Sequence, residues 1–383
     1  MSDTRKTTKP NVPNLRFPGF SGEWERVTIG QICNIVGGGT PDTNIKEYWN
    51  GGIQWFTPSE VGKEKYVSDS IRTISIDGLK NSSAKLLPPY SILLSSRATV
   101  GECSINLREC CTNQGFQSAV PKVDITSTEF LYYRLLTHKR EFIKKACGST
   151  FLEISAKQIS KLNTFIPARS EQEKIADLLS LIDERISIQN KVIEKYESLI
   201  KALYEQLIPG DRDDHAALGT LVRICKGKQL NGEFLSEDGK YYVMNGGITP
   251  SGYYDDYNTP AGTISISEGG NSCGFVQYNE KPFWSGGHCY TLLQTTDERV
   301  QYKFLYHLLK SKQDDIMALR IGSGLPNIQK KDIGRFPIPM LPLEHQKAIT
   351  RLLDSVYKHI EYEQALLAEL VHLKSFFLGA LFI

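Results

Sequence analysis

The chain has 383 residues, of which 40% are hydrophobic and 23% are charged, and its formal net charge is +2. This is the composition of an ordinary globular protein with room for two or three domains. The sequence has no uninterrupted apolar run of the ~18 residues needed to span a bilayer. Its polar start, MSDTRKTTKPNVPN, lacks the apolar core of a signal peptide, so a cytoplasmic protein is expected.

The eight cysteines do not form a metal-binding pattern, because none belongs to a Cys-x-x-Cys pair and no histidine cluster accompanies them. Neither a zinc site nor a disulfide framework is expected. Positive charge is concentrated in the first part of the chain, where residues 1–168 hold 21 Lys and Arg against 15 Asp and Glu. This excess is a weak indication of a polyanionic partner.

Taken in chain order, residues 1–168 are expected to form a globular domain of short strands joined by long loops. β-Branched runs alternate there with stretches rich in Gly, Pro, Asn and Ser. Residues 169–208 have instead the pattern of one long helix. Its apolar residues follow one another at alternating steps of four and three, a period of 3.5 residues that is typical of a coiled-coil seam.

About 37 residues at 1.5 Å per residue make a helix ~55 Å long. The expected seam of this helix contains Ile175, Leu179, Ile182, Ile186, Gln189 and Ile193.

The rest of the chain repeats this order. Residues 209–342 again have strand and loop character, and residues 343–383 have a second long-helix pattern. With a constant offset of 174 residues, the repeat matches SEQEKIADLLSLIDERI to EHQKAITRLLDSVYKHI, and FLYYRLLTHKREFIKK to FLYHLLKSKQDDIMAL. The second seam contains Ile349, Leu353, Val356, Ile360, Glu363 and Leu367.

The repeat predicts an α+β fold in which two globular domains are separated by two long antiparallel α-helices, with an internal pseudo-twofold repeat. In such a coiled coil, Gln189 and Glu363 would face each other and fix the register. The alternative is that each helix packs only on its own globular part. Two domains held apart by a coiled coil could read two separated half-sites on DNA, whose groove faces recur about every 34 Å.

The order of a globular domain, the helix EQEKIADLLSLIDERI, a second globular domain and a second copy of the helix resembles the specificity (S) subunit of type I restriction–modification enzymes. The stretches VPNLRFPGFSGEWERVTIGQI and GGGTPDTNIKEYWNGGIQWFTPSEV are similar to the first target-recognition domain of that family. The resemblance implies target-recognition domains at residues 1–168 and 209–342, and spacer helices at residues 169–208 and 343–383.

The resemblance also implies what the chain binds. In this family each target-recognition domain reads one half of a bipartite, asymmetric double-stranded DNA sequence, and the helices dock two modification (M) subunits. Those subunits bind S-adenosylmethionine, and two restriction (R) subunits can join them. The chain itself would then be non-catalytic, without a cofactor or a metal. The alternative is a coiled-coil adaptor, or an orphan specificity protein without an active restriction partner.

Loop residues of the two domains are the candidates for DNA contact, and for each of them a solvated role stays open. Bases are read by side chains such as Arg, Asn and Gln, whereas phosphates are bound by Lys, Arg and small hydroxyls. In the first domain the candidates are Lys63 and Lys65 for phosphates, Arg97, Asn113 and Gln114 for bases, and also Ser96 and Thr99. In the second domain they are Lys226, Lys228, Gln229, Asn245, Asn271, Ser285 and His288.

Two stretches resemble catalytic motifs but lack the residues that the chemistry needs. LPPY, residues 87–90, has Leu87 where amino-methyltransferases place an Asp or Asn whose oxygen accepts from the target amino group. VGGGTP, residues 36–41, lacks the Gly-Lys-Ser/Thr ending of a P-loop. The sequence therefore does not support a stand-alone methyltransferase or nuclease.

Overall fold

The computed structural model describes residues 11–147, 152–208, 214–322 and 324–383. The chain divides into two compact units, one made of Met1–Asn190 with Leu366–Ile383 and the other of Lys191–Ala365. The cut passes through both long helices, so each unit contains a part of each helix. Within the described ranges, no helix combines the length and the apolar character that crossing a membrane requires.

The first unit contains a five-stranded sheet of order β2-β9-β6-β7-β4 and two smaller sheets of order β5-β3-β8 and β1-β10. Its strands are β1 (Glu25–Thr28), β2 (Cys33–Gly37), β3 (Trp49–Phe56), β4 (Tyr66–Val67), β5 (Arg72–Ile74), β6 (Ile92–Leu94), β7 (Cys103–Asn106), β8 (Cys110–Thr112), β9 (Gln117–Pro121) and β10 (Asn163–Ile166). Its shorter helices are α1 (Ile29–Ile32), η1 (Lys46–Tyr48), η2 (Pro58–Glu60), α2 (Ile76–Lys80), α3 (Thr128–Thr137), α4 (Lys139–Lys145) and α5 (Ala156–Ser160).

The second unit contains a four-stranded sheet of order β12-β18-β15-β16 and smaller sheets of order β14-β13-β17 and β11-β19. Its strands are β11 (His215–Ala217), β12 (Val222–Lys226), β13 (Tyr241–Met244), β14 (Gly252–Tyr254), β15 (Thr263–Ser267), β16 (Val276–Asn279), β17 (Trp284–Ser285), β18 (Cys289–Gln294) and β19 (Pro337–Pro339). Its shorter helices are α7 (Leu218–Leu221), η3 (Gly232–Phe234), α8 (Tyr302–Ser311), α9 (Gln313–Ala318) and α10 (Lys330–Gly334).

Three strands form the same antiparallel ladder in both units. In the first unit β9 lies between β2 and β6, and in the second unit β18 lies between β12 and β15. Each ladder carries one row of apolar residues across its three strands, and burial of such a row on one face fixes the register. The corresponding rows are Ile35–Ala119–Ile92 and Ile224–Leu292–Ile264.

The match extends beyond the ends of β6 and β15. Ser96 lies four residues after Ile92, and Glu268 lies four residues after Ile264, so the two residues occupy the same place in the ladders. Their backbones also make corresponding hydrogen bonds in the two units. In the first unit, Ser96 N donates to Gly115 O (2.8 Å) and Ser96 O accepts from Ile154 N (3.1 Å). In the second unit, Glu268 N donates to His288 O (2.9 Å) and Glu268 O accepts from Ile328 N (2.9 Å).

Two glycines that directly follow β2 and β12 allow the same close approach of two loops. A Cβ atom at Gly38 would overlap the carbonyl oxygen of Asn113, and a Cβ atom at Gly227 would overlap the carbonyl oxygen of Gly286. Because only glycine lacks that atom, a larger residue would push the loops apart. In both units the loop after the first ladder strand therefore packs on the backbone of the loop before the central strand.

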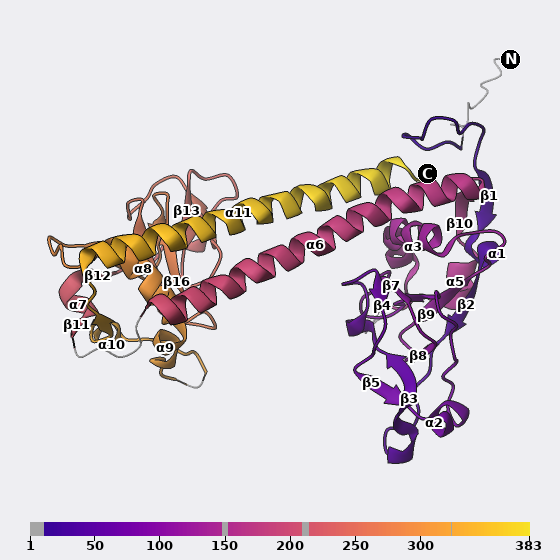
Figure 1. The fold of residues 1–383 in the computed structure, drawn as a ribbon, viewed down its shortest axis with the longest axis horizontal. Coiled ribbons are helices and arrows are strands. Elements are labelled where there is room, and N and C mark those ends of the chain that lie inside the picture. Colours follow the sequence, from indigo (N-terminus) through magenta and orange to yellow (C-terminus); the bar gives the residue numbers. More distant parts are fainter. Residues whose placement is uncertain (1–10, 148–151, 209–213, 323) are drawn as a thin grey trace. The chain divides into compact units, whose positions relative to one another are not determined.

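Helix α3 lies between the five-stranded sheet and the first long helix (Figure 1). Its start is set locally, because Ser127 accepts a hydrogen bond from Phe130 N at 3.2 Å as the N-cap residue. On its other face, the Tyr133 hydroxyl donates to Asp183 Oδ2 of the long helix at 2.6 Å. This contact fixes the long helix on the globular part of the first unit.

The two long helices predicted from the sequence are α6 (Arg169–Leu207, 39 residues) and α11 (Leu343–Ala380, 38 residues). In the first unit the start of α6 packs beside the end of α11, and Lys374 Nζ lies 2.6 Å from Asp183 Oδ1. The residues after α11 complete the core of this unit, where the ring of Phe382 lies 6.4 Å from that of Trp24.

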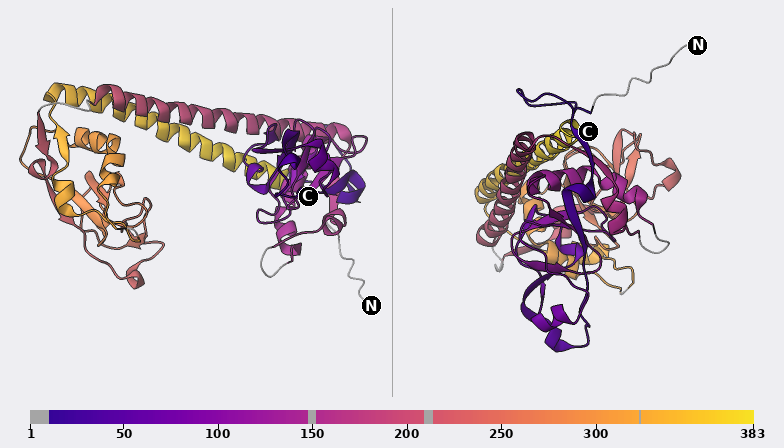
Figure 2. Two further views of the ribbon diagram at one scale, coloured as in Figure 1. Left: turned by 90° about the horizontal axis from the view of Figure 1, so that it is seen from below. Right: turned by 90° about the vertical axis from the view of Figure 1, so that its right-hand side faces the viewer.

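In the second unit the end of α6 packs beside the start of α11. The hydroxyls of Tyr204 and Tyr357 are 2.8 Å apart, and the rings of Tyr196 and His359 stack at 5.9 Å. In both units the helices therefore run side by side in opposite directions (Figures 1 and 2). This confirms the expected pair of long antiparallel helices, and packing of each helix only on its own globular part is not what the structure shows.

The residues expected along the seam lie on the covered sides of the helices, and the positions between them are mostly exposed. Burial at steps of four and three is what a coiled-coil seam requires. Ile186, Glu363 and Leu367 are half-buried, and the buried members are Ile175, Leu179, Ile182, Gln189, Ile193, Ile349, Leu353, Val356 and Ile360.

Candidate nucleic-acid interface

The two candidate lysines in the loop before β4 have different surroundings. Lys63 is exposed, whereas Lys65 Nζ donates to Ser180 Oγ of α6 at 2.6 Å and lies 4.9 Å from the ring centroid of Tyr133. Burial lowers the pKa of Lys65, and the carboxylate of Asp183 opposes this shift. Lys63 is therefore better placed to meet a phosphate than Lys65, whose ammonium group is held against the long helix.

Arg97 and Thr99 lie in an exposed turn that follows β6. The Arg97 guanidinium forms an ion pair with Glu153 at 3.2 Å, and the Thr99 hydroxyl lies 3.0 Å from that of Ser95. Between them, Ala98 has a φ of 62°, a left-handed conformation that residues other than glycine rarely adopt. An exposed ion pair contributes at most about 1 kcal/mol, so a DNA partner can replace Glu153 at small cost.

Two further candidates of the first unit lie in the loop between β8 and β9. Asn113 Oδ1 accepts from Gly115 N at 2.8 Å, which forms an Asx turn, and the exposed Gln114 side chain pairs with the Thr40 hydroxyl. Ser96 is fully buried, and among the described residues its Oγ has no hydrogen-bond partner. The exposed amide of Gln114 is thus the most accessible donor and acceptor of this loop.

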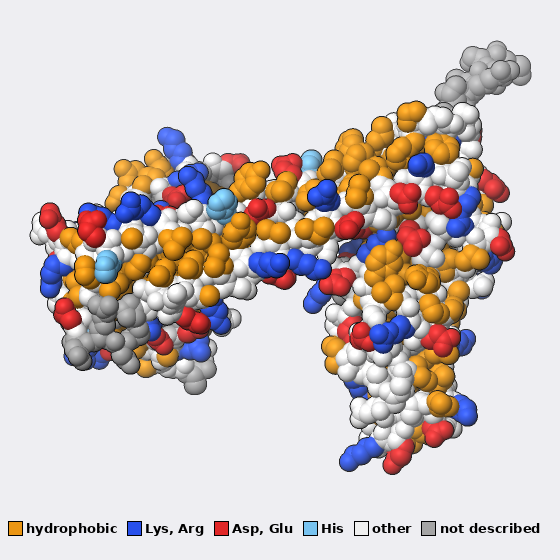
Figure 3. All heavy atoms as spheres, viewed as in Figure 1, with side chains coloured by type: hydrophobic (Ala, Val, Ile, Leu, Met, Phe, Trp, Pro, Cys, Tyr) orange, Lys and Arg blue, Asp and Glu red, His pale blue; other side chains and the backbone are white. Residues whose placement is uncertain are grey.

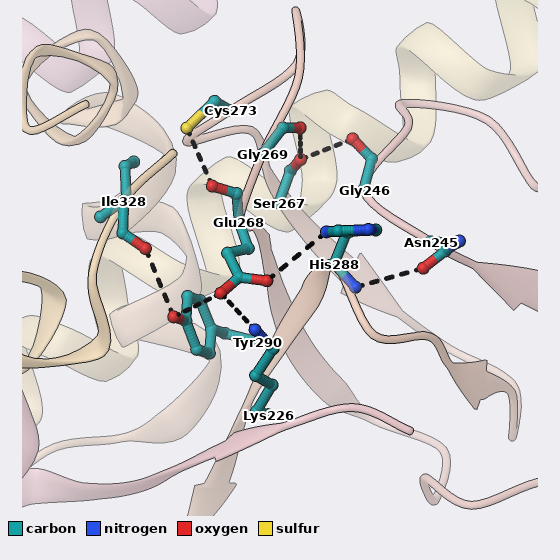
Figure 4. A network of polar contacts seen from close by, with 10 residues as sticks. All are labelled: Lys226, Asn245, Gly246, Ser267, Glu268, Gly269, Cys273, His288, Tyr290 and Ile328. Atoms are coloured by element: carbon teal, nitrogen blue, oxygen red, sulfur yellow. Dashed lines mark hydrogen bonds and ion pairs between the residues drawn. The ribbon is translucent and has the colours of Figure 1, made fainter. Parts of the chain in front are cut away.

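In the second unit, two candidates meet at a carboxylate that the sequence did not single out (Figure 4). Lys226 Nζ lies 2.6 Å from Oε1 of Glu268, and His288 Nδ1 lies 3.7 Å from its Oε2. The Tyr290 hydroxyl donates to Oε1 at 2.9 Å. Burial, followed by the hydrogen bond to Glu268, raises the pKa of Tyr290 to about 12, so this hydroxyl stays a donor at neutral pH.

A third candidate, Asn245, belongs to the same cluster. Its Oδ1 accepts from the backbone N–H of His288 at 3.2 Å, and the carbonyl of the next residue, Gly246, accepts from Ser267 Oγ at 2.5 Å. The ends of β12, β13 and β15 and the start of β18 therefore meet at one place (Figure 4).

The other candidates of the second unit lie around this cluster or below the surface. Lys228 and Gln229 are exposed in the loop after β12, where the Lys228 carbonyl accepts from Trp284 Nε1 at 2.9 Å. Asn271 is exposed in a turn after β15. Ser285 is buried at the end of β17, so its side chain does not face solvent.

Nothing in the described ranges resembles a metal centre, because no three His, Cys, Asp or Glu side chains are grouped there. Most cysteines are buried thiols. Burial raises the pKa of Cys33 to about 12 and that of Cys110 to about 12, which keeps both protonated and unreactive.

Sequence reasoning missed Glu268 because a single acidic residue in a glycine-rich loop is unremarkable. A signal was present in the sequences of the two ladder strands, SILLSSRA (residues 91–98) and TISISEGG (residues 263–270). When these are aligned, Glu268 occupies the position that corresponds to Ser96. Arg72 was not among the candidates either, and its guanidinium lies 3.6 Å from the ring centroid of Trp49. An arginine stacked on an aromatic ring presents a rigid donor edge of the kind that reads bases.

Comparison with known proteins agrees with this architecture. The family described as the type I restriction modification DNA specificity domain matches the chain twice, over residues 21–198 and 215–372. The type I restriction enzyme MjaIX specificity subunit of Methanocaldococcus jannaschii is 37% identical over 180 residues, which are 45% of this chain and 41% of that protein. The type I restriction enzyme EcoprrI specificity subunit of Escherichia coli is 22% identical over 362 residues, 88% of each chain.

A putative type I specificity subunit of Mycoplasma pneumoniae is 37% identical over 146 residues, 38% of this chain and 39% of that protein. The chain thus spans about two fifths of the length of the M. jannaschii and M. pneumoniae relatives, at 41% and 39%. All of these relatives are named as specificity subunits.

Solved structures extend the likeness to the whole fold. The S subunit of a type I restriction–modification system from M. genitalium superposes with a TM-score of 0.65 at 20% identity, covering 97% of this chain and 99% of that one. Because the identity is low, this likeness shows a shared fold, whereas the two family matches cover most of the sequence. The chain belongs to the family of type I restriction–modification specificity subunits.

Proposed function

We propose that the chain reads a bipartite, asymmetric double-stranded DNA sequence, with one half-site for each unit, as the specificity subunit of a type I restriction–modification enzyme. The observation that carries this proposal is the pair of matching ladders with unlike loops. A shared frame suits a target whose backbone is the same at both half-sites. Different loop side chains suit different base sequences, because phosphate contacts position a protein and base contacts specify the site.

In this proposal, residues 1–168 and 209–342 are the two target-recognition domains, and the helices at 169–208 and 343–383 set the spacing between the half-sites. Contacts of the first domain come from exposed side chains such as Lys63, Arg97 and Gln114. Contacts of the second domain come from the cluster formed by Lys226, Asn245 and His288 together with Lys228 and Gln229.

The long helices supply the docking surface for two modification subunits. Large apolar side chains are exposed on the faces of α6 and α11 that point away from the seam, and Figure 3 shows hydrophobic side chains gathered along these helices. Rows of such residues mark protein interaction sites, whereas single ones are ordinary. They include Leu181, Ile188, Val371, Leu373 and Phe376 in the first unit, and Leu199, Leu352 and Tyr362 in the second.

The partner is inferred from the family. One solved structure of similar fold, with a TM-score of 0.58 and 16% identity, is described as showing complex assembly of the type I restriction–modification system. Methyl transfer then takes place in the modification subunits, which hold S-adenosylmethionine. Two restriction subunits join through them, and this chain binds neither cofactor nor metal.

The test is to map modified bases in the DNA of cells that express the chain together with its modification subunits. We expect one split motif with a fixed number of unspecified base pairs between its halves. Capture of the modification subunit with no sequence preference would identify the chain as an adaptor instead. Modification of a split motif without any cleavage of unmodified DNA would identify an orphan specificity protein.

A further inference from the structure

Glu268 and Ser96 occupy the same backbone position in the two ladders but carry different side chains. Each lies just beyond the end of its strand, where loops with candidate contact residues meet. A position whose backbone is shared and whose side chain differs is where two copies of one frame can differ in target. It is therefore the first place to look for a residue that determines specificity.

The carboxylate of Glu268 is buried, with 6% of the residue exposed, and its two oxygens have unequal surroundings. Oε1 accepts hydrogen bonds from Lys226 Nζ at 2.6 Å and from the Tyr290 hydroxyl at 2.9 Å. Among the described residues, Oε2 has no hydrogen-bond partner, since His288 Nδ1 lies 3.7 Å away. One oxygen of a buried carboxylate is thus left able to accept a further donor.

The two charged neighbours of the Glu268 carboxylate reach the surface. The side chain of Lys226 is 54% exposed and that of His288 is 63% exposed. Exposed side chains change rotamer within nanoseconds, so the His288 imidazole can turn away from Oε2. The Lys226 ammonium group offsets the repulsion that Glu268 would otherwise exert on DNA phosphates.

We propose that Glu268 Oε2 accepts a hydrogen bond from the exocyclic amino group of one base, adenine N6 or cytosine N4, and so fixes one base pair of the half-site read by the second unit. These amino groups are the donors that the major groove presents, and a carboxylate is an acceptor that recognises them. The inference rests on the proposed DNA-reading function and names the position at which the second unit applies it.

The contrasting role for Glu268 is to position Lys226 and His288 without meeting a base. In that case its loss would weaken binding to every sequence alike. The two roles therefore differ in sequence preference rather than in affinity.

The experiment selects bound sequences from random DNA with the full chain in complex with its modification subunits. Glu268→Gln keeps the shape of the side chain but replaces one carboxylate oxygen by an NH2 group. Because Lys226 and Tyr290 both donate to Oε1, the NH2 group is expected at the place of Oε2. We expect the preference for an amino-bearing base to fall by about tenfold at one position of one half-site, in the range of a single side-chain–base contact. The other half-site should keep its preference, which shows that the variant is folded and assembled.

Two more variants make the result specific. Glu268→Ser introduces the side chain that the same backbone position carries in the first unit, and it should lose the same preference. Glu298→Gln makes the same change from glutamate to glutamine at an exposed position outside this cluster, so its selected motif should match that of the wild type. An unchanged motif for both Glu268 variants overturns this inference while leaving the proposed function intact. A wild-type complex that selects no motif overturns both.

Discussion

Gln172 and Gln346 make the same three backbone hydrogen bonds in the two halves of the chain. In each half, the amide oxygen accepts from the N-cap residue of α3 or α8, and the amide NH2 group donates to two carbonyl oxygens. This explains why glutamine stands at the same place in both copies of the helix motif. The partners are Ser127 N, Ile125 O and Pro167 O for Gln172 (3.1, 3.1 and 3.0 Å), and Gln301 N, Arg299 O and Leu341 O for Gln346 (2.7, 2.9 and 2.7 Å).

Replacing either glutamine by leucine should destabilise its own unit. The substitution leaves one N–H and two carbonyl groups without their partner, and each unsatisfied buried group costs about 1–3 kcal/mol. We expect Gln172→Leu and Gln346→Leu each to lower the free energy of unfolding by about 3 kcal/mol in urea titrations. Gln206→Leu, at an exposed position of α6, is the matched control and should have little effect.

The seam can be tested with neighbouring leucines. Leu179 is fully buried, whereas Leu181 is 54% exposed on the same helix. Leu179→Ala should lower the free energy of unfolding by about 3 kcal/mol through lost burial and a residual cavity. Leu181→Ala should change it by less than about 0.5 kcal/mol. Equal losses in the two variants would show that the assigned seam is wrong.

His138 should make the first unit sensitive to acid. Burial, with a smaller contribution from Arg134, lowers the pKa of His138 to about 4, although Glu141 opposes the shift. The unfolded chain takes up this proton near pH 6.5, so the stabilisation is complete above about pH 6.5 and is lost as the pH falls towards 4. The difference corresponds to roughly 3 kcal/mol.

The measurement compares unfolding of the wild type and of His138→Gln at pH 7.5 and pH 5. The wild type should lose clearly more stability over this interval than the variant. His307, whose pKa is also lowered by burial, stays in both proteins and sets the common background. Parallel pH profiles would exclude His138 as the cause.

The two kinds of DNA contact proposed for the first unit predict different defects. Arg97→Ala should relax the preference at one half-site position, because a base contact contributes about 1–3 kcal/mol of discrimination. Lys63→Ala should weaken binding to all sequences alike and reduce its salt dependence. Binding to cognate and scrambled duplexes at several salt concentrations separates the two. Equal losses on both duplexes for Arg97→Ala would refute its role in base reading.

The proposed docking surface predicts a loss of assembly without a loss of folding. A charge at an exposed apolar position is tolerated in the free chain but is costly when buried against a partner. Leu181→Asp and Phe376→Asp should therefore reduce co-purification of the modification subunit by at least tenfold, with an unchanged circular dichroism spectrum. Glu184→Ala, at an exposed polar position of α6, serves as the control. Undiminished co-purification would place the partner elsewhere.

The long helices and their antiparallel pairing could be predicted because one period runs through each helix and the 174-residue offset never breaks there. The matching ladders were much harder to find. Ile35 and Ile224 are 189 residues apart, whereas Ile92 and Ile264 are 172 apart, so no single offset aligns them. The offset changes because the loops between the strands differ in length, so a comparison at one constant offset does not align the two ladders.

Side-chain roles were predictable only where residue type alone decides them. Lysine is a residue type that often binds phosphate, but packing places the ammonium group of Lys65 beside Ser180 and the ring of Tyr133. Glu268 would repel phosphate if it were exposed, and only the surrounding Lys226 and Tyr290 make it a plausible reader. Both facts depend on contacts between residues far apart in sequence, which the local pattern does not encode.

The passage of both long helices through the two units has a consequence for synthesis on the ribosome. The core of the first unit needs Leu381 and Phe382, whereas the second unit is one uninterrupted stretch, Lys191–Ala365. The half that is translated first is therefore the last to be completed. A chain that stops just before residue 366 would contain the whole second unit but would lack the C-terminal residues that complete the core of the first unit.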